Sequence, residues 1–389
     1  MQPQAIAPCS TERAPARLYF PALDGLRAMA FLMVFGQHYL HLPWGWSGVD
    51  IFFVLSGFLI TGVLYDSRER PHRVRDFYIR RTLRIFPLYY GVLLLLLLTY
   101  PILRWDWSWK WLLWPAYLGN FCHGLHPMSI PAPLQKLSDF LPQSRSFSSV
   151  QLYLGHFWSL CVEEQFYLFW PWVVFRVRDR KKLMSICLFF CVACPLMRAI
   201  GSHTIPQYIL DRGALYRWTP FRIDALLLGG WVSLVLRGAA ADRLRKAVRV
   251  VGGTLFVAMI AFVACHSYAE ILHPKWQYTW GLTLVDLVAA CLIVMALEPG
   301  STIYRVFSLR PLRWIGRISY GAYIFHEMLH PIYINIVVHY IANRAILVAV
   351  VGLPMTLLLA WASFRWYETP FIRLKERWTR GSPDVQPTL

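Results

Sequence analysis

The sequence predicts an all-α integral membrane protein, a bundle of about ten transmembrane helices with both termini cytoplasmic. Of its 389 residues, 57% are hydrophobic and only 15% are charged, whereas a soluble protein carries about a quarter charged residues. Apolar segments of the length that a bilayer requires, about 18 to 22 residues, recur along the whole chain. A soluble fold is therefore excluded.

Ten segments are predicted to span the membrane, and each is a run of apolar residues interrupted by few charges. They are 25–41, 48–65, 85–103, 157–175, 183–200, 218–236, 250–266, 279–297, 314–336 and 346–366. A further apolar segment, 109–121, is too short to cross and is interpreted as an interfacial or re-entrant piece.

The basic residues indicate the orientation. Twenty-seven of the 39 Lys and Arg lie in the two tails and in one set of alternate loops, eight lie in the other set, and four lie within the spans. Cytoplasmic loops carry the excess of Lys and Arg, so both termini are expected inside. The net charge of +18 thus reflects topology, and nucleic-acid binding is not expected.

The chain is interpreted as one membrane domain, 19–372, between cytoplasmic tails 1–18 and 373–389. No soluble domain is expected after the tenth span. The long outer segment 101–156 begins with a run of tryptophans, Trp105, Trp107, Trp109, Trp111 and Trp114. Such residues form either an interfacial belt or a platform on which a sugar ring stacks.

Two ionisable residues share the first span. Arg27 and His38 are eleven residues apart, so they sit about 20° apart around the helix and about 16 Å apart along it. Charged groups inside the hydrocarbon are costly and usually line a bundle interior or a functional path. The pair predicts a polar track with a histidine well along it, which is typical of a membrane enzyme. Arg27 has an alternative role as the partner of Asp24 in a salt bridge.

Five further motifs place polar residues at the ends of spans or inside them. They run over Gly48–Phe58 (GVDIFFVLSGF), Phe77–Pro87 (FYIRRTLRIFP), Trp158–Tyr167 (WSLCVEEQFY), Phe221–Asp224 (FRID) and Ser319–His326 (SYGAYIFH).

In this order and spacing, the motifs resemble the acyltransferase-3 family of integral membrane O-acyltransferases over about residues 19–372. The resemblance implies transfer of an acyl group, often acetyl, from acyl-CoA to a hydroxyl of a cell-surface or exported glycan, or of a glycosylated small molecule. Acyl-CoA is then a co-substrate, and no permanently bound cofactor is expected. Many relatives continue into an extra hydrolase-like domain that is not expected here.

The catalytic candidates are His38, Glu163 and Glu164. O-acylation requires a base for the hydroxyl proton, and imidazole has a suitable pKa. On the residues alone, His38 is either this base or a histidine hydrogen-bonded between helices; the resemblance favours the base. The two glutamates face different sides of their helix. The resemblance favours Glu164 as the carboxylate that orients the histidine, and the other is expected to pair with an arginine such as Arg222.

The donor candidates are the arginines at the inner mouth of the third span together with Arg27. Arg81 and Arg84 are one turn apart and share a face, and guanidinium groups suit the phosphates of coenzyme A. Arg80 is adjacent. The alternative is that these residues are ordinary positive-inside anchors; the resemblance favours coenzyme A.

A supporting or substrate-contacting network is expected from Asp50, Arg222, Asp224 and His326. Arg222 and Asp224 are two apart on a helix, so each needs its own partner. His41, His123, His126 and His156 are expected to be exposed or interfacial, and no ligand spacing predicts a metal.

Two functions remain open from the residues. The leading hypothesis is an O-acyltransferase of the inner or plasma membrane, with acyl-CoA, a glycan or lipid-linked saccharide, membrane lipid and proteins of a glycan pathway as partners. The alternative is a transporter or flippase of polyprenyl-linked sugars, in which intramembrane charges are equally expected. Transporters often contain internal repeats, and none is visible here.

The topology is testable with reporter fusions after residues 70, 130, 180 and 380. We expect cytoplasmic signals from all but the fusion at 130, because the loops rich in Lys and Arg stay inside. A cytoplasmic signal from position 130 would overturn the orientation.

Overall fold

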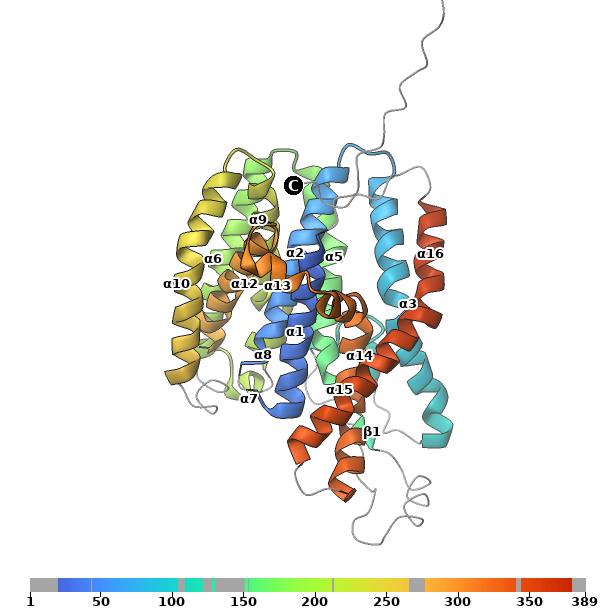
Figure 1. Ribbon diagram of the computed structural model, residues 1–389. Coiled ribbons are helices and arrows are strands. Elements are labelled where there is room, and N and C mark those ends of the chain that lie inside the picture. Colours follow the sequence, from blue (N-terminus) through green and yellow to red (C-terminus); the bar gives the residue numbers. More distant parts are fainter. Residues whose placement is uncertain are drawn as a thin grey trace, which may run out of the picture.

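The computed structural model describes residues 20–42, 44–103, 109–121, 128–129, 151–152, 154–211, 213–265, 277–340 and 344–379. Helices dominate this part of the chain and form one bundle (Figure 1). Its single strand pairing joins two antiparallel two-residue strands, β1 (Met128–Ser129) and β2 (Gln151–Leu152). The all-α prediction is confirmed.

Each of the ten predicted segments is a helix. These helices are α1 (Pro21–Leu40), α2 (Ser47–Ser67), α3 (Arg73–Leu103), α5 (Trp158–Arg176), α6 (Arg180–Thr204), α9 (Ile223–Leu236), α10 (Ala241–Cys265), α12 (Leu282–Ala296), α14 (Arg310–Tyr340) and α15 (Arg344–Ala362).

Shorter helical pieces lie between these helices or, in the case of α16, follow the last of them. Four are α-helices: α7 (Gln207–Leu210), α8 (Ala214–Arg217), α13 (Thr302–Phe307) and α16 (Thr369–Trp378). The predicted short segment 109–121 contains two 3₁₀ turns, η1 (Trp109–Leu113) and η2 (Gly119–Phe121), and two more 3₁₀ turns are η3 (Gly155–Phe157) and η4 (Thr219–Phe221). The π-helical pieces are η5 (Gln277–Gly281) and η6 (Ser363–Glu368).

Four stretches of the described chain are long and apolar enough to cross a membrane: Ser47–Ser67, Arg73–Thr99, Arg180–Thr204 and Ala349–Lys375. Two further helices, α9 and α12, are apolar but shorter. The membrane character is therefore built into the fold, whereas the count of ten spans and the cytoplasmic placement of the termini stay predictions.

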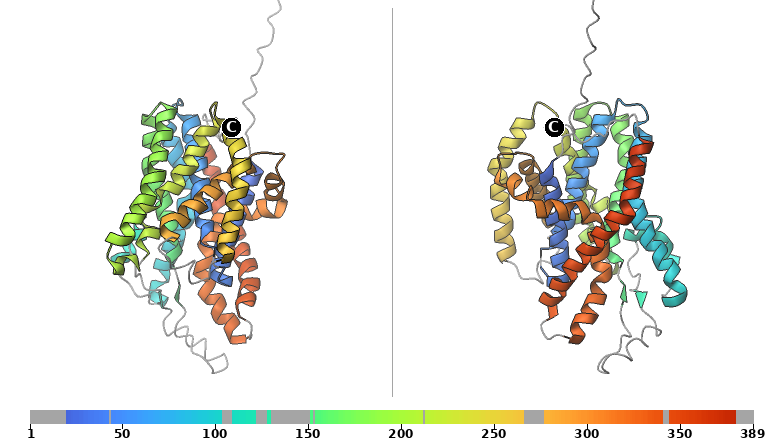
Figure 2. Two further views of the ribbon diagram at one scale, coloured as in Figure 1. Left: turned by 90° about the vertical axis from the view of Figure 1, so that its left-hand side faces the viewer. Right: turned by 45° about the vertical axis from the view of Figure 1, so that its right-hand side comes forward.

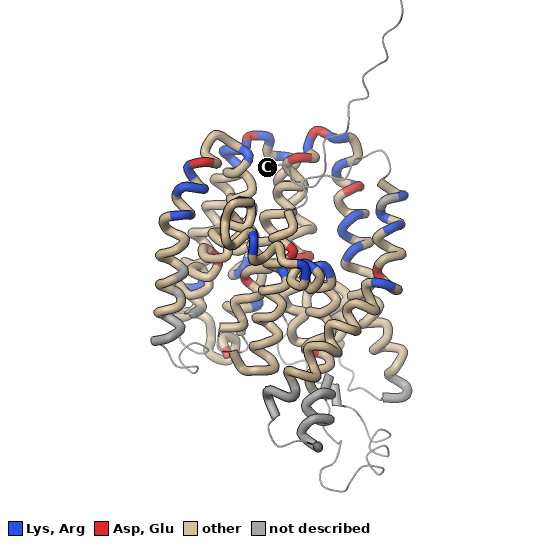
Figure 3. The backbone as a smooth tube through the Cα atoms, viewed as in Figure 1, with Lys and Arg blue, Asp and Glu red and all other residues tan. Residues whose placement is uncertain are grey.

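The helices are arranged around α1 and α2 (Figures 1 and 2). On one side of this pair lie α6, α9, α10 and α12; on the other lie α5, α3 and α16, while α14 and α15 form a hairpin that extends past one end. The basic residues collect at the opposite end, with a second group about half-way down the bundle (Figure 3). Basic residues thus also lie at mid-height, inside the outline of the bundle.

The tightest contact for the site is between α1 and α14, which run parallel. Gly316 of α14 packs against the carbonyl of Asp24, and a Cβ there would overlap that backbone. Just before α14, the carbonyl of Phe307 in α13 packs in the same way against Gly25 of α1. Further along, the Tyr39 hydroxyl donates to the carbonyl of His326 at 2.8 Å. The two helices therefore stay in register along their length.

We expect Gly316→Ala to destabilise the protein by about 1–3 kcal/mol, because the added methyl has no space against the Asp24 carbonyl. The matched control is Gly253→Ala in α10, where nothing lies within 4 Å of the added atom, so stability should stay equal or rise. Thermal unfolding in detergent measures both. A Gly316→Ala protein as stable as the parent would contradict the close helix contact.

Candidate active site

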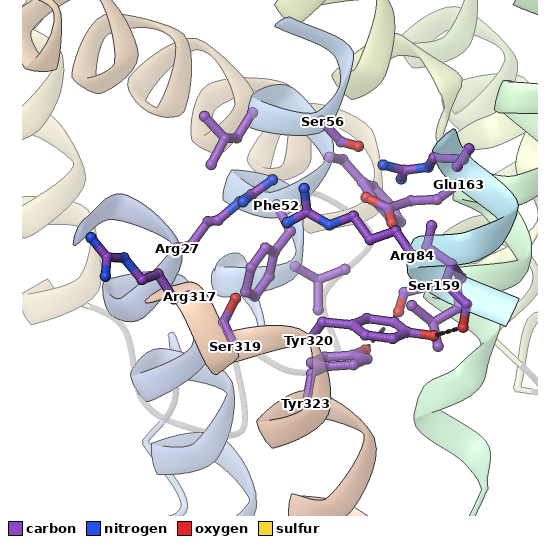
Figure 4. A pocket seen from close by; sticks show the side chains of 16 residues that line it. Arg27, Phe52, Ser56, Arg84, Ser159, Glu163, Arg317, Ser319, Tyr320 and Tyr323 are labelled. Carbon is purple, nitrogen blue, oxygen red and sulfur yellow. Dashed lines mark hydrogen bonds between the residues drawn. The ribbon is translucent and has the colours of Figure 1, made fainter. Parts of the chain in front are cut away.

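A cavity opens among five helices, α1, α2, α3, α5 and α14. Its volume is about 790 Å³, including the part that is open to the surroundings. The polar side chains that line it include those drawn in Figure 4: Arg27, Ser56, Arg81, Arg84, Ser159, Glu163, Arg317, Ser319, Tyr320 and Tyr323. We call this cavity the arginine pocket.

The arginine pocket carries an excess of positive charge, with four arginines and one carboxylate, Glu163, in its wall. Figure 4 shows Arg27 and Arg84 reaching into the same space from different helices. Arg27 and Arg317 each lie 4.0 Å from a carboxylate oxygen of Asp24. No described carboxylate lies within ion-pair distance of Arg84. Such a wall is suited to an anion.

Arg81 is held by two neighbours on α5. Its Nε lies 3.8 Å from Oε1 of Glu164, and its guanidinium stands 3.7 Å above the ring of Tyr167. Contact with an aromatic face and a carboxylate fixes the direction of a guanidinium group. Arg81 is thus oriented before any ligand arrives.

The structure separates the predicted donor residues. Arg27, Arg81 and Arg84 line the arginine pocket, whereas Arg80 does not. The prediction missed Arg317, which belongs to none of the recognised motifs. Arg317 lies in α14 and lines the same pocket. The alternative salt bridge from Arg27 to Asp24 is also present, at 4.0 Å.

The two glutamates of α5 face different sides of the helix, as predicted, but their neighbours differ from those expected. Glu163 faces the arginine pocket, and Glu164 faces Arg81. The expected pairing of Glu164 with His38 is wrong, as is the pairing of a glutamate with Arg222, whose partner is Asp50. Helical periodicity fixed the two faces but not the helix that each face meets.

The carboxylate beside His38 is Glu327 of α14. Its Oε2 lies 2.7 Å from Nδ1 of His38, within reach of a charge-assisted hydrogen bond once the N–H is aligned. The signal in the sequence was the acidic residue next to His326 in an apolar segment. The parallel register of α1 and α14 brings the two together.

Two more histidines surround this pair. The ring centroid of His326 lies 5.3 Å from that of His38 and 5.2 Å from that of His156. His156 is 5% exposed, so the expectation that it is exposed or interfacial is wrong: η3 turns it into the core ahead of α5. We call His38, His156, His326 and Glu327 the histidine chamber.

The ring of Tyr323 stands between the two sites. It lines the arginine pocket, and its centroid lies 5.3 Å from that of His326 and 5.5 Å from that of His156. Its hydroxyl is held by Ser159 at 2.6 Å and by the carbonyl of His156 at 3.0 Å. His38 does not line the pocket, so Tyr323 marks the boundary between the arginine pocket and the histidine chamber.

A second polar network lies outside the pocket. Arg222 pairs with Asp50, and Arg198 pairs with Asp224 at 2.8 Å, so Arg222 and Asp224 have separate partners as predicted. The prediction did not single out Asp286 of α12, which is also buried. These residues join α2, α6, α9 and α12.

Two tryptophans of the tryptophan-rich segment form neither an interfacial belt nor a platform for a sugar. Trp111 and Trp114 are buried at 8% and 3% exposure, and they pack into the hydrophobic core rather than at a membrane surface or a sugar. Trp109 is exposed. Trp105 and Trp107, like His123 and His126, lie outside the described residues.

The family model of the acyltransferase domain, acyltransferase-3, matches residues 20–365. The chain belongs to the acyltransferase-3 family. This membership confirms the resemblance and favours an enzyme over a transporter. The matched range contains both the arginine pocket and the histidine chamber. No solved structure matches the chain.

Curated relatives include the peptidoglycan O-acetyltransferase OatA of Listeria monocytogenes, 30% identical over 91% of this chain and 56% of the relative. The chain is also similar to the putative peptidoglycan O-acetyltransferase YrhL of Bacillus subtilis, at 31% over 90% and 55%, and to O-acetyltransferase OatA of Staphylococcus aureus, at 27% over 90% and 57%. It spans a little over half the length of these relatives.

Proposed function

We propose that the protein is a membrane O-acetyltransferase that moves an acetyl group from acetyl-CoA to a hydroxyl of a cell-wall or exported glycan. The observation that supports this most is the pairing of an anion-binding pocket with a histidine–glutamate pair along the same two helices. The acceptor class follows the names of the relatives, which act on peptidoglycan.

The donor end is assigned to the arginine pocket. Arg27, Arg84 and Arg317 approach from three helices, and the phosphates of coenzyme A are the anions that such guanidinium groups bind. A second group of basic residues lies about half-way down the bundle, further in than the group at the basic end (Figure 3). A donor entering from the cytoplasmic side would leave its phosphates there and extend its pantetheine arm further in.

The chemical step is assigned to His38. Along α1, His38 lies about 16 Å beyond Arg27, a gap comparable to the length of a pantetheine arm. With Nδ1 turned toward Glu327, Nε2 is the free nitrogen that takes the hydroxyl proton. The hydroxyl oxygen bonds to the acyl carbon, the carbon–sulfur bond breaks, and the proton passes on to the leaving thiolate.

Glu164 has a supporting role in this proposal. Glu164 contacts Arg81 rather than His38. Replacing it is therefore expected to weaken binding of the donor. Asp50, Arg222 and Asp224 support the helices that carry the pocket and stay outside its wall.

The donor site is tested by replacing Arg84 with Gln. We expect coenzyme A to bind about ten- to a hundred-fold more weakly, because a hydrogen bond to a charged group is worth about 1.5–3 kcal/mol. Isothermal titration of the purified protein measures this. The matched control is Arg80→Gln on the same helix, which lies outside the pocket wall and should keep its affinity. Unchanged affinity in Arg84→Gln would show that the arginine serves topology alone.

The catalytic assignment is tested with His38→Ala. We expect acetyl transfer to fall by about 10²- to 10⁴-fold, the contribution of a general base, while coenzyme A affinity stays normal. Glu327→Gln should lower kcat with little change in the KM for the donor, because it removes the carboxylate beside Nδ1. The control is His41→Ala, an exposed histidine just past the end of α1. Parental transfer rates in folded His38→Ala would reject the mechanism.

A further inference from the structure

Two buried histidines of the chamber have fixed tautomers. Nδ1 of His326 lies 2.6 Å from the carbonyl oxygen of Tyr323, and Nε2 of His156 lies 3.1 Å from that of Ile324. A carbonyl only accepts, so each of these nitrogens carries the hydrogen. In a neutral imidazole the other ring nitrogen is then an acceptor.

Both remaining nitrogens lack a donor. Nε2 of His326 and Nδ1 of His156 are buried and have no hydrogen-bond partner among the described residues. His326 is 0% exposed and His156 is 5% exposed. A buried acceptor without a donor costs about 1–3 kcal/mol, and most such groups in proteins are satisfied. The arrangement is therefore suited to a ligand that donates hydrogen bonds.

We propose that the histidine chamber is the binding site of the acceptor's hydroxyl groups, and that it takes a neutral polyol such as a sugar with two neighbouring hydroxyls. This inference rests on the proposed function. One hydroxyl is presented to Nε2 of His38, and its neighbour donates to Nε2 of His326. The two rings lie 5.3 Å apart between centroids, close enough for one ligand to contact both.

The chemistry of the chamber selects this class of ligand. The chamber disfavours an anion, because His326 and His156 present lone pairs and the carboxylate of Glu327 lies nearby. The arginine pocket, by contrast, favours an anion. The side chain of His38 is 32% exposed although it lies outside the wall of the arginine pocket, and in the proposal the acceptor enters on this exposed side of His38. Donor and acceptor thus meet from different sides of Tyr323.

A metal ion is the competing ligand for the same lone pairs. His38, His326 and Glu327 offer three ligand atoms within 4.8 Å of one another. However, Nδ1 of His38 and Oε2 of Glu327 are 2.7 Å apart, the spacing of a shared proton. Two ligands of one zinc ion, each at about 2 Å in tetrahedral geometry, lie more than about 3 Å apart. The geometry favours hydroxyl binding.

His326 acts as a positioning residue. It stays neutral through the reaction and holds the neighbouring hydroxyl, so that the attacking oxygen faces His38. Its loss should weaken acceptor binding and leave donor binding intact, which a merely structural role in the bundle would not do.

The test uses the purified full chain and chitotetraose, a soluble oligosaccharide of N-acetylglucosamine, with binding measured by calorimetry. We expect His326→Phe to bind chitotetraose about two- to tenfold more weakly, the loss of one hydrogen bond, with unchanged affinity for coenzyme A. His326→Gln, which keeps an acceptor oxygen, should recover part of the affinity. His41→Phe is the matched control and should bind normally.

Three results discriminate the outcomes. Parental chitotetraose affinity in folded His326→Phe or His326→Gln would overturn the inference. Stoichiometric zinc in the parent, measured by elemental analysis and lost in His326→Phe, would replace it with a metal site. Loss of transfer in His38→Ala, with chitotetraose binding weakened by no more than the loss of one hydrogen bond, supports both assignments, whereas parental transfer in His38→Ala rejects only the catalytic proposal.

Discussion

The parallel contact between α1 and α14 is the constraint on which both sites depend. Gly316 allows the backbones to touch at Asp24, and from that point the two helices advance together to Tyr39 and the carbonyl of His326. Because both helices rise by the same amount per residue, Arg27 stays level with Arg317, and His38 stays level with Glu327. One packing contact thus sets the positions of the arginine pocket and of the pair His38 and Glu327.

The two ends differ in charge, and in the proposed mechanism this difference separates the donor from the acceptor. Arginines from three helices face the pocket, whereas the chamber presents nitrogen lone pairs and a carboxylate. In a low-dielectric interior such contrasts are strong. Tyr323, fixed by Ser159 and the His156 carbonyl, lies between them. The proposed charged donor and neutral acceptor would each be favoured at one end only.

The buried ion pairs away from the pocket stabilise the frame. Asp50 with Arg222 and Arg198 with Asp224 connect helices that are far apart in sequence. Removing one partner of such a pair leaves an uncompensated buried charge, which costs about 3–5 kcal/mol. Arg222 also faces the rings of Tyr216 and Phe53 at 4.9 and 5.5 Å. Polar residues in these helices therefore have a structural use that is independent of the reaction.

The sequence by itself determined the helical segments and the membrane character, because hydrophobic length and helical periodicity are local properties. Its motifs indicated the family, and they singled out Arg27, Arg81 and Arg84, which line the arginine pocket. It also placed Glu163 and Glu164 on different faces. Only the tertiary structure decided which faces meet: Glu327 rather than Glu164 lies beside His38, and His156 is buried in the chamber. Periodicity orients a residue within its own helix, whereas its partner is chosen by packing between helices distant in sequence.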